Sequence, residues 1–262
     1  MLVFLTKLGA LQMLKLSDFH GRLLRTDDVE TLGKPTHNLL IDAIDKGEKE
    51  LAKDLAHAGH NEDKSLHDLF CDWVWDLLTK ISSHCGESLM YKILRESQET
   101  WMLRRTWKVF SKMSVKQQVE LTAEMMRSHR CGPKQEGDIK IEEDKEKYTI
   151  IMDPCGSGGR MRRGDVVDGT PSRLTKPYNF GVTQKAYDWS WNKKGVPYYC
   201  IHCAVNEILP IEWGGYPLWV TGYEEDAAKP CKWMFYKNPD LIPEKYWKRV
   251  GKTKPDSFSH KK

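Results

Sequence analysis

Four cysteines in the second half of the chain carry the clearest chemical signal in the sequence. Cys200 and Cys203 form a C-x-x-C pair, a spacing that can turn two sulfurs toward one tetrahedral ion. Cys155 lies in a glycine-rich stretch and Cys231 at a predicted turn. Thiolates are soft ligands that suit zinc or an iron–sulfur cluster. The sequence therefore predicts a metal site made by these four residues, with Zn²⁺ favoured because a ferredoxin-type cysteine run is absent.

Two residues beside the C-x-x-C pair are candidates for acid–base chemistry. His202 lies between the two cysteines and is expected either to ligate the metal or to donate a hydrogen bond to a ligand. Glu207 follows closely and is a candidate general base. The alternatives are a half-buried structural histidine and a solvated carboxylate. Without a metal, Cys155 is a candidate nucleophile that His202 would activate.

The stretch after Cys155 is typical of an anion site. Gly156, Ser157 and Gly158 expose backbone N–H groups, and Arg160 and Arg162 follow at once. Backbone donors and guanidinium groups suit a carboxylate or a phosphate. An extended chain here would place these two arginines on one face and leave the next arginine at the surface. The alternative is a flexible loop with solvated arginines, because the P-loop, dinucleotide and G-x-S-x-G motifs are all absent.

Together these residues predict a zinc-dependent enzyme of the hydrolase or lyase type. Its substrate would be a small anionic organic molecule, and His202 or Glu207 would move protons. The alternative is a binding or regulatory module in which zinc only stabilises the fold. The sequence names neither the substrate nor the reaction.

The elements that must position these residues change in character along the chain. Ten of the twelve prolines lie at or after position 154, and eleven of the nineteen glycines at or after position 156. We therefore expect an α+β protein. Its predicted parts are an N-terminal segment (1–35), a bundle of about four helices (36–132), a charged connector (133–147) and a β-rich domain built around the cysteine cluster (148–262).

Periodicity places the individual elements. Apolar residues at spacings of three and four predict a helix over 66–81, which leaves Asp68, Asp72 and Asp76 on an opposite, solvated face. The other elements expected are helices over 39–56, 87–109 and 114–131, the last with a Ser114–Gln117 capping box, and strands over 148–152, 196–201, 217–221 and 233–236. Residues 1–16 are read as an amphipathic helix, or as an extension that precedes a start at Met13.

Composition limits the partners. Lysine and arginine exceed aspartate and glutamate by 41 − 37 = 4, which argues against nucleic acid in the absence of a basic patch. No apolar run approaches the ~18 residues of a membrane helix. Seven cysteines, an odd number without a secretory signal, indicate a reducing, cytoplasmic setting. The helical bundle is a candidate surface for homo-oligomer contacts.

Overall fold

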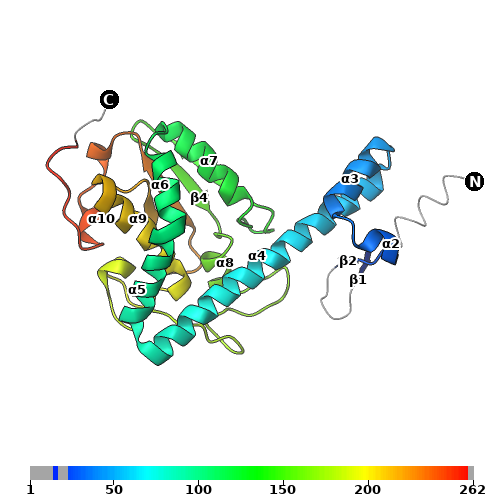
Figure 1. Cartoon of the computed structure of the whole chain (residues 1–262), viewed down its shortest axis with the longest axis horizontal. Coiled ribbons are helices and arrows are strands. Elements are labelled where there is room, and N and C mark those ends of the chain that lie inside the picture. The colour runs from blue at the N-terminus through cyan, green and yellow to red at the C-terminus, as the bar shows by residue number, and fades with distance from the viewer. Residues whose placement is uncertain (1–13, 17–22, 259–262) are drawn as a thin grey trace, which may run out of the picture. The chain divides into compact units, whose positions relative to one another are not determined.

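A computed structural model describes residues 14–16 and 23–258 of the 262-residue chain. It has the predicted α+β class: N-terminal helices precede a four-stranded antiparallel sheet that is accompanied by further helices (Figure 1). Two compact units divide the chain, residues 1–69 and residues 70–262. Within the part of the chain that is described, no helix has the length and apolar character needed to cross a membrane.

The first unit begins with a small hairpin. Its elements are β1 (Leu14–Leu16), β2 (Leu23–Arg25), α2 (Val29–Leu32), α3 (Thr36–Asp45) and the start of α4 (Lys49–Cys85). The Arg25 guanidinium donates to Thr36 Oγ1 (2.8 Å), and Thr36 donates to Glu62 (2.7 Å), so polar contacts join β2, α3 and α4. Residues 14–16 form a strand rather than the predicted helix, and the rest of that prediction, residues 1–13, lies outside the described residues.

Helix α4 exposes most of its predicted apolar stripe, although Leu78 is buried. Phe70, Trp73 and Leu77 are 50%, 62% and 50% exposed. The opposite side of the helix is buried, with Trp75 fully enclosed among the core residues of the second unit. The indole of Trp75 donates to the carbonyl of Gly181 (2.8 Å), which fixes this side of the helix inward.

The predicted solvated acidic face of this helix is therefore wrong at Asp72. Its two carboxylate oxygens accept hydrogen bonds from Nε and Nη2 of the buried Arg173, at 2.8 and 2.9 Å. A distant arginine thus makes an acidic position part of the packed side. Such a contact, 101 residues apart in sequence, leaves no trace in local periodicity.

The next helices follow the predictions closely. The region predicted as one helix over 87–109 contains α5 (Glu87–Ser97), a π-helical segment η1 (Gln98–Leu103) and α6 (Arg104–Phe110). Helix α7 (Val115–Arg127) starts at the predicted capping box, in which Ser114 Oγ accepts from the Gln117 backbone N–H and the Gln117 side chain accepts from the Ser114 N–H. Helix α7 packs against the sheet (Figure 1).

The sheet has the strand order β3-β4-β6-β5. Its strands are β3 (Lys140–Glu143), β4 (Lys147–Met152), β5 (Val220–Gly222) and β6 (Cys231–Tyr236). The strands predicted over 148–152 and 233–236 are confirmed, and the one over 217–221 is confirmed in part. Strand β3 falls inside the predicted connector and is exposed along its length. Charged side chains suit such an edge strand, because they discourage pairing with another chain.

Residues 196–201 do not form the predicted strand. The chain passes through a short 3-10 turn, η3 (Tyr198–Cys200), into α9 (Ile201–Gly214), which places the C-x-x-C pair at the start of a helix. Residues 204–211 of this helix are all buried. A helix that is apolar all round has no amphipathic stripe, so its sequence resembles a buried strand.

The remaining segments close the second unit. Short helices α8 (Gly158–Arg163) and α10 (Lys245–Lys248) lie outside the sheet, with 3-10 turns η2 (Asp188–Ser190) and η4 (Pro239–Leu241). One core cluster includes Trp75, α9 and Trp247, and a second lies beside the sheet. The side chain of Cys203 contacts both clusters. The C-x-x-C pair therefore lies where helical and sheet packing meet.

Candidate thiol site

Cys155 and Cys231 meet at one end of the sheet. Met152, the last residue of β4, pairs with Cys231, the first residue of β6. The chain then turns through Cys155 into α8, and the backbone N–H of Gly159 donates to Cys155 Sγ at 2.9 Å. The Cys231 thiol also forms a hydrogen bond with Cys155. A strand, a turn and a short helix thus hold one sulfur among several donors.

These donors lower the pKa of Cys155 to about 6. The largest cause is the hydrogen bond from Cys231, which burial opposes; the backbone N–H groups of Gly159 and Ser157 and the charge of Arg162 add to the lowering. The pKa of Cys231 is raised well above its usual range, because its proton is held in the bond to Cys155. At neutral pH the pair is therefore a thiolate at Cys155 and a thiol at Cys231.

The two cysteines of the C-x-x-C pair are protonated thiols in this arrangement. Burial raises the pKa of Cys200 to about 12 and raises that of Cys203 well above its ordinary value. Cys200 packs tightly on the glycine turn: a methyl group at Gly158 would lie 2.3 Å from Cys200 Sγ. Only glycine at that position lets the turn approach the sulfur so closely.

The four cysteines are neighbours, but the expected cluster is not shown. The negative charge of an ionised Cys155 raises the pKa values of Cys200, Cys203 and Cys231. Four sulfurs around one zinc would lie about 3.8 Å apart, given Zn–S bonds of ~2.3 Å. In the described part of the chain, no three of these sulfurs lie within 4.8 Å of one another. The structure therefore brings the predicted ligands into one region without ligand spacing.

Both nitrogens of His202 have partners close to their own helix. Nδ1 lies 2.5 Å from the carbonyl oxygen of Tyr199, and Nε2 lies 3.3 Å from Cys203 Sγ. Burial lowers the pKa of His202, so the ring is neutral at pH 7. With Nδ1 donating to the carbonyl, Nε2 accepts from the Cys203 thiol. This arrangement holds Cys203 as a thiol.

Glu207 is fully buried in a closed charge pair. Both of its carboxylate oxygens accept from Arg249 Nη2 at 2.7 Å, and Oε1 also accepts from the Thr221 backbone N–H (2.7 Å) and from Trp191 Nε1 (3.3 Å). Burial raises the pKa of Glu207, and the Arg249 charge opposes that shift. These contacts attach α9 to the strand β5 and to the C-terminal segment.

The three arginines after the turn have different surroundings, because the segment is the helix α8 and not an extended chain. Arg160 is buried and binds Asp165 (2.6 Å). Arg163 lies partly exposed and binds Asp153 (2.9 Å). The expectation that Arg160 and Arg162 share one face rested on strand alternation, which a helix does not have.

Arg162 is the arginine that faces the cysteines. It is buried, lies 5.1 Å over the Tyr223 ring, and donates through Nη1 to the Tyr223 hydroxyl (3.2 Å) and to the carbonyls of Glu224 and Glu225. Its charge acts on Cys155, Cys200 and Cys231. Its Nη2 is buried and has no hydrogen-bond partner among the described residues. An anion beside the cysteines would supply that partner.

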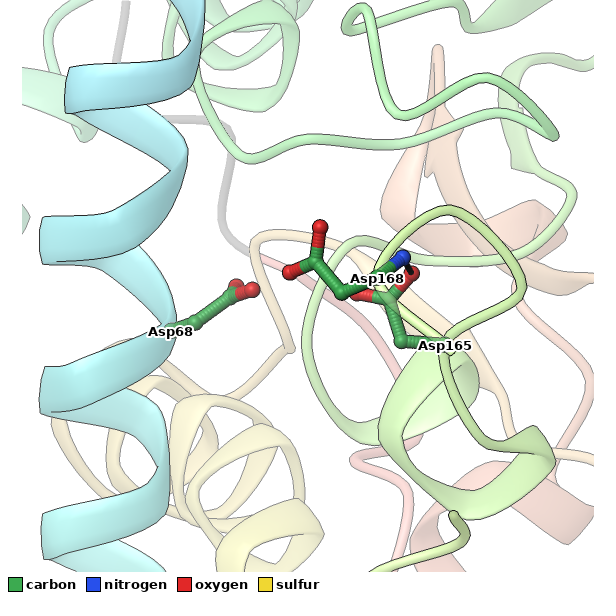
Figure 2. A group of neighbouring side chains, drawn as sticks. All are labelled: Asp68, Asp165 and Asp168. Carbon is green, nitrogen blue, oxygen red and sulfur yellow. Dashed lines mark hydrogen bonds between the residues drawn. The ribbon is translucent and has the colours of Figure 1, made fainter. Parts of the chain in front are cut away.

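The loop after α8 carries the partner of Arg160. Figure 2 shows Asp165 and Asp168 on this loop, where the Asp168 backbone N–H donates to Asp165 Oδ1 at 3.2 Å. The third carboxylate in the figure, Asp68, belongs to the first unit, where Lys64 donates to it (2.9 Å). Asp165 thus binds its own loop and Arg160 at once, which is a structural role.

Sequence reasoning missed a histidine at this site. His129 Nε2 lies 2.8 Å from Ser157 Oγ. The contact depends on Gly156, since a methyl group there would lie 1.3 Å from the carbonyl oxygen of His129. No spacing in the sequence links two residues 28 positions apart. The unusual run of glycines around Ser157 was the available signal, because it indicates close approach of another backbone.

Comparisons with protein-family models, with curated proteins and with solved structures find no match to this chain.

Proposed function

We propose that the protein is a hydrolase that uses Cys155 as its nucleophile and acts on a small organic substrate with an anionic group. The observation that carries this proposal is the set of donors around one sulfur: the Gly159 N–H at 2.9 Å, the Cys231 thiol and the nearby Arg162 guanidinium. A thiolate is the reactive form of cysteine, and such surroundings are typical of reactive rather than structural cysteines. Cys155 as a residue is half-buried.

The proposed reaction is acyl transfer to Cys155. The thiolate attacks the carbonyl carbon of an ester, thioester or amide, a C–S bond forms, and the bond to the leaving group breaks. The leaving group departs with its electron pair and takes a proton. Water then attacks the resulting thioester, releases the acid and restores the thiolate.

Arg162 supports the anionic nature of the substrate. Three of its contacts hold the guanidinium in place, and Nη2 remains available in a buried position. A carboxylate bound there would gain a charged hydrogen bond worth about 1.5–3 kcal/mol. Of the two arginines predicted to bind substrate, Arg162 is therefore the one that we propose, while Arg160 has its partner in Asp165.

Zinc chemistry is the second candidate, favoured by the gathering of Cys155, Cys200, Cys203 and Cys231 in one region. These thiols have the right chemistry for zinc. Their spacing and the positive charge of Arg162 fit a thiolate better than a cation. Metal analysis of the purified protein separates the two proposals, and a stoichiometric zinc that blocks alkylation of Cys155 would favour the zinc proposal, whether enzyme or regulatory module.

The test of the thiol proposal uses two alkylating reagents of similar size. Iodoacetamide is neutral and iodoacetate carries a carboxylate. We expect Cys155 to react faster than the exposed Cys85 at pH 7, with an additional preference for iodoacetate. Peptide mass spectrometry assigns each site, and Cys155→Ala is the control. Equal rates at Cys155 and Cys85 in the metal-free protein would contradict the proposal.

A further inference from the structure

The turn that holds Cys155 also holds a serine–histidine pair. Ser157 is buried, and its Oγ lies 2.8 Å from His129 Nε2. The same residue donates its backbone N–H to Cys155. Its hydroxyl also forms a hydrogen bond with Tyr199, whose own hydroxyl lies 3.2 Å from Cys71 Sγ. One residue therefore connects the thiolate to a histidine and a tyrosine.

The position of this pair is determined by backbone packing on both sides. A methyl group at Gly156 would collide with the carbonyl of His129, and one at Gly158 would collide with Cys200 Sγ. The backbone N–H of Gly132 donates to the Pro154 carbonyl at 3.1 Å, which ties the chain after His129 to the turn. The backbone segments that carry the serine and the histidine are thus closely packed against each other.

A hydroxyl that is hydrogen-bonded to a histidine, on a residue whose backbone N–H contacts the nucleophile, can transfer protons. Ser157 Oγ has one proton and can accept another, and the imidazole can take or give a proton at Nε2 according to its tautomer. A thiolate needs no base before it attacks, but the water that hydrolyses the thioester must lose a proton, and a poor leaving group must gain one. A positioned acid–base group contributes typically 10²–10⁴-fold to such steps.

We propose that Ser157 is a second catalytic residue of this site and that His129 is the positioning residue that exchanges protons through it. The inference rests on the proposed function of Cys155. In the hydrolytic step, water attacks the thioester carbonyl and gives a proton to Ser157 Oγ, while the Ser157 proton passes to His129 Nε2. The C–S bond breaks with its electron pair on sulfur, the acid leaves, and His129 returns its proton to solvent.

The experiment separates the two chemical steps with mono-4-nitrophenyl succinate, an activated ester with a free carboxylate. Nitrophenolate is a good leaving group and needs no proton, so acylation of Cys155 appears as a burst. Hydrolysis of the thioester sets the steady-state rate. We expect Ser157→Ala and His129→Gln to keep the burst and to lose the steady-state rate by about 10²-fold or more.

Matched controls and a double variant make the result specific. Ser128→Ala and His84→Gln change an exposed serine and an exposed histidine and should leave both phases unchanged. The double variant of Ser157 and His129 should be no slower than the slower single variant, because the two act as a unit. A fall in burst amplitude that follows a fall in folded fraction, measured by circular dichroism, would point to a structural role.

Each outcome either supports or overturns the proposed relay. A preserved burst with a slowed steady state supports the relay. An unchanged steady state in both folded single variants overturns the relay and leaves Cys155 as the nucleophile. The absence of a burst in the wild-type protein overturns the proposed function and with it the relay.

Discussion

Two buried charged centres in the second unit differ in how their partners are arranged. At Glu207, the anion meets its cation directly, since Arg249 Nη2 lies 2.7 Å from each carboxylate oxygen, and two further donors complete the shell. At Cys155, the cation is Arg162, which donates to four carbonyl or hydroxyl groups, while its Nη2 has no hydrogen-bond partner among the described residues. The first centre is a completed ion pair, and the second leaves one buried guanidinium nitrogen without a partner among the described residues.

The partners of the two charged groups differ more than their pKa values do. Both Glu207 and Cys155 have shifted pKa values, upward at the carboxylate and downward at the thiol. The shift alone therefore does not identify the site. The partners do: Glu207 accepts from three donor groups that include its cation Arg249, whereas the cation near Cys155, Arg162, has a buried nitrogen without a hydrogen-bond partner among the described residues. Arg249 Nε also has no hydrogen-bond partner among the described residues, but the Glu207 carboxylate that Arg249 binds has hydrogen bonds to both oxygens.

The largest expected effect is on folding at the completed centre. Glu207→Ala leaves Arg249, whose side chain is 20% exposed, without its buried carboxylate partner, and this loss costs up to about 3–5 kcal/mol of unfolding free energy. Urea unfolding measures the change. Glu212→Ala, which removes a more exposed partner of Arg95 and Lys252, should cost about 0–1 kcal/mol. Equal losses of unfolding free energy in the two variants would show that the Glu207–Arg249 pair contributes no more to stability than the more exposed pairs of Glu212.

The next effect is on anion preference at the open centre. Arg162→Gln should lower the ratio of iodoacetate to iodoacetamide alkylation at Cys155 by about 10- to 150-fold, the equivalent of about 1.5–3 kcal/mol for a charged hydrogen bond. Loss of the Arg162 charge also raises the pKa of Cys155, which slows its reaction with both reagents. The ratio of the two rates removes this common effect. Arg162→Lys keeps the positive charge but lacks the planar guanidinium group, so its alkylation ratio should lie between those of the wild type and Arg162→Gln. A ratio that stays constant in folded variants would argue against an anion subsite.

A smaller effect concerns the glycine turn. Gly158→Ala would place a methyl group 2.3 Å from Cys200 Sγ, and overpacking of this kind costs about 1–3 kcal/mol. Gly33→Ala is the matched control, because its methyl group would have no atom within 4 Å. Thermal unfolding compares the two variants. Equal melting temperatures would show that the turn can move away from Cys200.

The smallest effect is expected on the exposed side of α4. Trp73 is 62% exposed, so Trp73→Lys should change the unfolding free energy by no more than about 0.5 kcal/mol. A large loss at high dilution would mean that this tryptophan is buried in the folded monomer. Sedimentation velocity on the same variant tests the predicted self-association through the helices, because a lysine in an apolar contact between two copies would weaken it.

Helices α4 and α9 show how far the sequence could predict this fold. The 3- and 4-residue spacing correctly indicated a helix at Trp73, but not which side packs, because Trp75 and Asp72 are held by Gly181 and Arg173 from a distant loop. Helix α9 was missed because its residues are buried on all sides and give no stripe. Local capping at Ser114 was predicted correctly, since all its contacts lie within four residues.

The candidate site follows the same rule. Cys155 and the turn after it were recognisable because reactive residue types and glycines are adjacent in sequence. The sequence indicated Arg160 and Arg162 equally as anion-binding residues. It could not show that Arg160 is paired with Asp165, because that contact depends on the helical geometry of α8. His129 had no local signal at all, because its contact with Ser157 is made by the packing of two separate backbone segments.

The pH dependence of alkylation at Cys155 shows directly whether this sulfur is a thiolate at neutral pH. The Cys155 pKa is lowered to about 6, so its rate with iodoacetamide should rise as pH increases through 6 and be level by pH 7.5, whereas that of the exposed Cys85 should still be rising there. Mass spectrometry of the metal-free protein follows both peptides in one sample. A Cys155 profile that rises only above pH 8, in parallel with Cys85, would contradict a thiolate at this site.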